Sequence, residues 1–272
     1  MRTFTSFRDR VAVVTGGASG IGRGIASELR AEGMQVVIGD IEERALAETA
    51  AQIGAIGVRT DVSDFASVEA LAATVRRRFG AVHLVCNNAG VGSIGRIADL
   101  TLADWQWMLG VNLWGVIHGV KAFLPLLRAN EDGGHFVNTA SVGGFVTMPG
   151  LGAYAVTKYG VVALSETLAQ ELAEEGAKVG VTVLCPGPVR THIKTSTRNR
   201  PAGSSGALTD VDFEQTEFGA SARWLDPREV GRIVVAAVRR GELYAFTHPE
   251  QFGAIEQRFA ALARAAGRPS AS

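Results

Sequence analysis

The sequence predicts an α/β fold in which a mostly parallel, doubly wound sheet carries helices on both faces. Short apolar runs such as Val11-Ala12-Val13-Val14 have the composition of strands that are buried on both sides. Stretches with helical character separate these runs along the whole chain, and this alternation is typical of a parallel sheet. A glycine-rich turn between the first strand and the first helix indicates a nucleotide site.

Length and composition fit one large domain and argue against several function classes. The 272 residues are 47% hydrophobic and 20% charged, with 27 basic and 27 acidic side chains. The equal numbers of basic and acidic side chains argue against a protein that binds nucleic acids or anionic membranes in general. Cys86 and Cys185 lie in or end apolar runs, which indicates buried thiols, and the histidines lack metal-ligand spacing. We expect a single domain over residues 1–272 without a metal.

Two stretches bear on location. Residues 1–10 are polar and lack the apolar core of a secretory signal. Leu109–Leu127 is the most apolar long stretch, but it contains Asn112, Lys121 and Pro125, so we expect a buried or interface helix rather than a membrane span. The expected location is the cytoplasm.

The first strand leads into Thr15-Gly16-Gly17-Ala18-Ser19-Gly20-Ile21-Gly22 and then into a helix over Arg23–Glu32. Gly16 allows a tight turn, Gly20 lets the backbone approach a pyrophosphate, and Gly22 allows close packing of the helix. The phosphates would lie at the positive end of this helix. We therefore predict a dinucleotide site.

The second strand, Gln35–Gly39, ends at Asp40. A carboxylate there can accept hydrogen bonds from both ribose hydroxyls of NAD and would repel the 2′-phosphate of NADP. Ser19 and Ile41, which could carry a compensating cation, are not basic, and Arg44 is interpreted as a charge on a helix face. We predict NAD rather than NADP, with a role of Asp40 as a simple helix cap as the alternative.

The alternation continues to the end of the chain. Further strands are expected at Ala55–Arg59, Val82–Cys86, His135–Thr139, Val179–Leu184 and Glu242–Thr247, and helices at Ile41–Gly54, Asp64–Phe79, Thr101–Leu127, Ala153–Glu175, Pro227–Arg240 and about 249–266. Ser63 or Asp64 would cap one helix, and Asp226 another, with Pro227 at its first position.

Residues of about 192–225 break the pattern, with Phe213, Phe218 and Trp224 among Ser, Thr, Gly and charged residues. A long irregular segment in a compact domain is typically a functional lid or a disordered insertion. Because it follows the sixth strand, it falls at the carboxyl edge of the sheet, and we interpret it as a substrate-covering lid.

Tyr154 and Lys158 lie four residues apart in a predicted helix and so on one face of it, with Ser141 thirteen residues before the tyrosine. A nearby ammonium favours the phenolate, and a phenol whose pKa falls toward neutral can take a proton from an alcohol. The alternative is an aromatic core residue beside a solvated lysine.

Taken in order, the motifs resemble those of the short-chain dehydrogenase/reductase family over about residues 10–247. They are Thr15-Gly16-x-x-x-Gly20-x-Gly22, Asp61-Val62, Asn87-Asn88-Ala89-Gly90, Asn112, Ser141, Tyr154-x-x-x-Lys158 and Pro186-Gly187. The resemblance implies a three-layer Rossmann fold with a seven-stranded sheet, assembled as a tetramer or dimer through its two long helices.

The resemblance also implies roles. Tyr154 is the expected general acid/base, Lys158 lowers its pKa and binds the nicotinamide ribose, Ser141 binds the reacting oxygen, and the backbone of Asn112 holds a water in a proton relay. Asp61 would accept the adenine amine, Asn88 would contact its ribose, and Val189 with Thr191 the carboxamide. The residues expected to hold NAD are Gly16, Ser19, Gly20, Ile21, Gly22, Asp40, Ile41, Asp61, Val62, Asn88, Gly90, Tyr154, Lys158, Pro186, Gly187, Val189 and Thr191.

Apolar residues flank these motifs at Val91, Ile94, Phe145, Val146 and Met148. An apolar pocket beside one hydroxyl-binding pair predicts a lipophilic secondary alcohol or ketone as substrate. Two alternatives stay open. One is an NADP-linked ketone or acyl-carrier reductase on the same fold, and the other is a non-catalytic NAD-binding regulatory protein.

Overall fold

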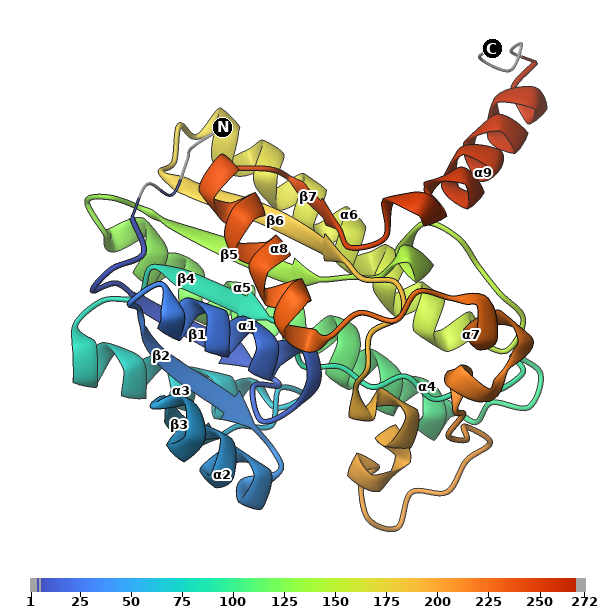
Figure 1. Cartoon of the computed structure of the whole chain (residues 1–272), viewed down its shortest axis with the longest axis horizontal. Coiled ribbons are helices and arrows are strands. Elements are labelled where there is room, and N and C mark those ends of the chain that lie inside the picture. The colour runs from blue at the N-terminus through green and yellow to red at the C-terminus, as the bar shows by residue number, and fades with distance from the viewer. Residues whose placement is uncertain (1–3, 5, 268–272) are drawn as a thin grey trace.

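The computed structural model describes residue 4 and residues 6–267, and it contains a seven-stranded sheet between two layers of helices (Figure 1). Every strand pair in this described part is parallel, in the order β3-β2-β1-β4-β5-β6-β7. The predicted three-layer α/β fold is confirmed. The strands are Val11–Thr15 (β1), Gln35–Asp40 (β2), Ile56–Arg59 (β3), Leu84–Asn87 (β4), Gly134–Thr139 (β5), Val179–Cys185 (β6) and Tyr244–Phe246 (β7).

The α-helices fall close to the predicted ranges. They are Gly20–Ala31 (α1), Glu43–Ile53 (α2), Phe65–Phe79 (α3), Leu102–Leu109 (α4), Gly115–Ala129 (α5), Gly152–Glu174 (α6), Glu217–Ser221 (α7), Pro227–Arg240 (α8) and Phe252–Ala265 (α9). Asp64 caps α3, and Asp226 caps α8 in a capping box with Pro227 in its first turn, as predicted.

Each strand places alternate side chains on opposite faces of the sheet, and this divides the core in two. Ala12 and Val14 of β1 pack with residues of α1, α2 and α8. Val11 and Val13 pack on the other face with residues of α3, α5 and α6. Both layers are visible in Figure 1. Cys86 and Cys185 are free and buried, as expected.

The sequence predicted one long helical region over Thr101–Leu127, but the structure interrupts its α-helical geometry. A π-helical turn over Gly110–Trp114 separates α4 from α5. Leu102–Ala129 is the one helical run of the described residues whose length and composition would suffice to cross a membrane. In the structure this run packs along the sheet beside α3 and α6.

Strand order reverses direction between β1 and β4, which opens a crevice at the carboxyl ends of these strands. Residues 192–225 cross this end of the sheet as two short 3₁₀ helices, His192–Asn199 and Phe213–Gln215, followed by α7 (Figure 1). Helix α9 projects away from the sheet. The site therefore lies where sequence-distant loops meet.

Candidate functional site

A cavity of about 660 Å³ occupies the carboxyl edge of the sheet and is walled by the loops after β1, β2, β3, β4, β5 and β6. Most predicted site residues reach it, and the two that do not, Gly22 and Asn112, lie behind its wall. Those that line it are Gly16, Ser19, Gly20, Ile21, Asp40, Ile41, Asp61, Val62, Asn88, Gly90, Ser141, Tyr154, Lys158, Pro186, Gly187, Val189 and Thr191.

The glycine-rich turn has the geometry that its sequence predicts. Gly16 and Gly20 have φ of +65° and +50°, where a side chain is strained. A Cβ on Gly22 would lie 2.1 Å from the carbonyl oxygen of Gly16, so this glycine lets α1 pack against the turn. The helix that follows begins at Gly20, so its free N–H groups face the cavity, an arrangement suited to a pyrophosphate.

Asp40 stands at the end of β2 with its carboxylate held by backbone donors. The amide of Ala18 donates to its Oδ2 at 3.0 Å and the amide of Glu42 to its Oδ1 at 3.1 Å. Burial raises the pKa of Asp40, while these hydrogen bonds oppose the rise. Glu42 is the N-cap residue of α2, so Asp40 is not a helix cap. The carboxylate instead faces the cavity rim.

Asp61 and Asn88, which are predicted to contact the adenosine part of NAD, form hydrogen bonds with other residues of the protein. Asp61 accepts hydrogen bonds from the amide and hydroxyl of Ser63, at 2.9 and 2.7 Å. The side-chain amide of Asn88 donates to the carbonyls of Thr15 and Gly16, at 3.0 and 3.4 Å. Asn88 thereby joins the loops after β1 and β4, and its contact with a ribose stays a prediction.

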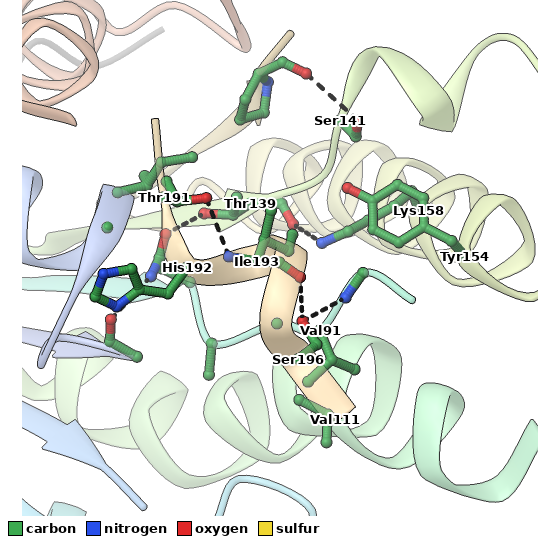
Figure 2. Close-up of a pocket in the computed structure, with 18 of the residues that line it drawn as sticks. Val91, Val111, Thr139, Ser141, Tyr154, Lys158, Thr191, His192, Ile193 and Ser196 are labelled. Carbon is green, nitrogen blue, oxygen red and sulfur yellow. Dashed lines mark hydrogen bonds between the residues drawn. The ribbon is translucent and has the colours of Figure 1, made fainter. Parts of the chain in front are cut away.

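Ser141, Tyr154 and Lys158 lie on one side of the cavity (Figure 2). Tyr154 and Lys158 occupy the first two turns of α6, and the lysine Nζ lies 5.5 Å from the centre of the phenol ring. The same Nζ donates to the Thr139 carbonyl at 2.9 Å. Ser141 follows β5 and accepts a hydrogen bond from the Gly143 amide at 3.0 Å. The three side chains converge as predicted.

The expected lowering of the tyrosine pKa is wrong for the chain by itself. Burial raises the pKa of Tyr154, and hydrogen bonding to the Ser141 hydroxyl only partly opposes this. Burial also lowers the pKa of Lys158 to about 8. The lysine does not offset the burial of the phenol because its ammonium lies over the ring and is bonded to Thr139.

Asn112 lies in the π-helical turn and is fully buried. Its Oδ1 accepts from the Val91 amide at 2.8 Å, and its Nδ2 donates to the Val91 carbonyl at 2.9 Å and to Thr157 Oγ1 at 3.3 Å. The side chain therefore ties the loop after β4 to α6, next to Lys158. π-Helical turns are frequent at functional sites.

Residues 192–225 form one wall of the cavity. The Gly92 amide donates to Ser196 Oγ at 3.0 Å, so the short helix lies against the loop after β4 (Figure 2). Arg200 pairs with the buried carboxylate of Asp104 at 2.5 Å, and Ile94 forms an isolated β-bridge with Thr209. Phe213 and Trp224 line the cavity, while the side chain of Phe218 lies outside the described part.

The apolar pocket differs in part from the prediction. Val91, Val146 and Met148 line the cavity, but Ile94 and Phe145 do not. Phe145 turns away to pack on Tyr244 and Phe246, because β7 offers an aromatic surface that was not visible from the local sequence. The side chains that the sequence did not single out and that line the cavity include Trp107, Val111, Leu151, Ile193, Arg198, Arg200 and Gln251.

Comparisons with known proteins agree with this geometry. The family model for short chain dehydrogenases matches residues 10–202. The probable oxidoreductase EphD of Mycobacterium tuberculosis is 35% identical over 90% of this chain, which spans only 42% of that relative's length. The C alpha-dehydrogenase of Sphingobium sp. strain SYK-6 is 32% identical, over 94% of this chain and 86% of the relative. A solved short-chain dehydrogenase/reductase from Burkholderia phymatum in complex with NAD has a TM-score of 0.89, with 36% identity over 99% of both chains.

Proposed function

Because the chain belongs to the short-chain dehydrogenase/reductase family of oxidoreductases, we propose that it interconverts a lipophilic secondary alcohol and its ketone, with NAD as the hydride carrier. The observation that carries this proposal is the convergence of Ser141, Tyr154 and Lys158 on the cavity that also contains the glycine-rich turn. A candidate proton-transfer group and a candidate nucleotide site thus share one cavity, which is what alcohol oxidation by hydride transfer requires.

The residues present fit NAD. The turn from Gly16 to Gly22 would hold the pyrophosphate, Asp40 the adenosine ribose, and Val189 with Thr191 the carboxamide. When bound, NAD accepts hydride from the carbon that bears the hydroxyl. The NAD complex of the Burkholderia phymatum relative supports this assignment.

The protein's part is proton transfer and alignment. Tyr154 would protonate the carbonyl oxygen during reduction and deprotonate the hydroxyl during oxidation. Its raised pKa in the chain alone keeps the phenol protonated at neutral pH, so the proton that it would donate during reduction is in place. Ser141 would hydrogen-bond the same oxygen as charge develops on it, and Lys158 would bind the nicotinamide ribose. Asn112 would fix a water beside Lys158 in a relay to solvent.

Substrate class follows from the apolar side chains on the wall of the cavity. Apolar or aromatic surface is presented there by Val91, Val146, Met148, Trp107 and Phe213. A lipophilic ligand is favoured because its binding removes this surface and its own apolar surface from water. We also propose that the chain works as a dimer or tetramer through α5 and α6, since Trp114 of the π-helical turn that joins α5 is 51% exposed.

A graded set of secondary alcohols tests the proposal. The native chain would be assayed with glycerol, 2-butanol, cyclohexanol and 1-phenylethanol, each with NAD and with NADP. We expect kcat/KM with NAD to rise along this series by about fourfold for each additional buried methylene equivalent. Turnover confined to polyols would contradict the substrate class, and a higher kcat/KM with NADP would contradict the interpretation of Asp40. NAD binding without any turnover would indicate a regulatory protein.

A further inference from the structure

The loop after β2 presents a second carboxylate to the cavity besides that of Asp40. Asp40, Ile41 and Glu42 all line it, and the backbone amide of Glu42 is bonded to the Asp40 carboxylate. The charge of Glu42 is close enough to raise the pKa of Asp40, although burial is the larger cause. The side of the cavity that would hold the adenosine ribose is therefore doubly acidic.

Glu42 reaches across the cavity rim to residues 198 and 199. Its Oε1 accepts from Arg198 Nε at 3.1 Å, from Arg198 Nη2 at 2.6 Å and from Asn199 Nδ2 at 2.8 Å. Desolvation alone would raise the pKa of Glu42, but the bonds from Asn199 and Arg198 outweigh it and lower the pKa. Glu42 is thus ionised at neutral pH.

Arg198 has no spare donor nitrogen in this arrangement. Its Nη1 donates to the carbonyls of His192 and Thr195, at 2.9 and 2.7 Å, and to Thr195 Oγ1 at 2.9 Å. Nε and Nη2 are both bonded to Glu42. The side chain nevertheless lines the cavity and is 35% exposed. An arginine in such a place matches the planar, two-donor geometry that binds phosphate.

We propose that Glu42 is a second residue that selects against the 2′-phosphate of NADP, because it engages Arg198 and adds negative charge beside Asp40. A 2′-phosphate carries about −1.5 to −2 charges and would face two carboxylates rather than one. With both carboxylates removed, Arg198 becomes a phosphate-binding residue. The inference rests on the proposed function only in assigning the Asp40 side to the adenosine ribose.

The test measures the dissociation constants of NADH and NADPH by titration of cofactor fluorescence, without substrate. The variants are Asp40→Ser, Asp40→Ser/Glu42→Gln, and the same pair with Arg198→Gln. We expect Glu42→Gln in the Asp40→Ser background to tighten NADPH binding by about tenfold relative to NADH, as gained by one charged hydrogen bond. Adding Arg198→Gln should remove most of that gain and leave only the smaller part that comes from relief of charge repulsion.

Glu43→Gln is the matched control, since Glu43 lies one residue away but pairs with Arg59 at 2.8 Å outside the cavity. This control should leave the ratio of the two dissociation constants unchanged. If Glu42 only holds residues 192–199 in place, Glu42→Gln will weaken NADH and NADPH equally, which overturns the proposal. A gain in NADPH affinity that survives Arg198→Gln in full also overturns it. By contrast, a native chain that prefers NADPH would refute the proposed function itself.

Discussion

At the residue scale, Tyr154 and Lys158 show what local spacing can and cannot predict. Their separation of four residues placed both side chains on one helix face, as found. Their electrostatics depend on burial and on the carbonyl of Thr139, nineteen residues before the lysine, and no local pattern encodes these. For the same reason the predicted lowering of the tyrosine pKa is wrong for the chain by itself.

The buried ammonium of Lys158 makes the free energy of unfolding depend on pH. Its pKa is about 8 in the folded chain against 10.5 ordinarily, so the folded chain binds fewer protons between these values. The free energy of unfolding therefore rises by about 3 kcal/mol from this group as pH increases from 8 to 10.5. Below pH 8 the lysine is charged in both states, and the folded chain bears the full cost of burying that charge.

Lys158→Met should remove this dependence. At pH 7 the variant should be about 1 kcal/mol more stable than the native chain, because relief of the charge penalty exceeds the cost of about 1–3 kcal/mol for the unpaired Thr139 carbonyl. Urea unfolding of both proteins from pH 7 to 10.5 checks this. A stability difference that stays constant over that range would show that the lysine is not desolvated.

At the element scale, the sequence predicted the strands and helices well where apolar periodicity was strong. It missed the π-helical turn at Gly110–Trp114, because this stretch is apolar on most sides and a local change in helical phase leaves no mark in such a pattern. That turn holds Asn112 inward and turns Trp114 outward, where the indole lies beside His118 at 5.7 Å between ring centres.

The exposed Trp114 predicts a contact between copies of the chain. Trp114→Lys should shift a native dimer or tetramer toward a smaller species, because burial of a charge in an apolar contact is unfavourable. Leu262→Lys on α9 is the matched control, with a side chain of equal exposure (51%) on a different element. Sedimentation velocity at micromolar concentration measures both. A native monomer, or equal effects of the two variants, would contradict assembly through α5.

At the scale of the whole molecule, parallel topology explains why the site could be predicted so far. Loops after parallel strands meet at one edge of the sheet. Motifs that are far apart in the sequence therefore line one site once the strand order is known. Residues 192–225 have no apolar periodicity, and their contacts are made with residues that are distant in the sequence. Glu42 and Arg198 are 156 residues apart, so the local sequence around Asp40 and the glycine-rich turn offers only Ser19, Ile41 and Arg44 as positions for a cation. Arg44 pairs with Glu48 on the exposed face of α2, as predicted.

The central claim is that Tyr154 transfers the proton in an alcohol–ketone reaction, and Tyr154→Phe tests it most directly. The change removes one oxygen and leaves the ring in its place on α6. We predict that kcat for the best alcohol falls by about 10²–10⁴, the range for loss of a general acid/base, while the NADH dissociation constant stays within about twofold. A variant that binds NADH normally and turns over at the native rate would contradict the claim.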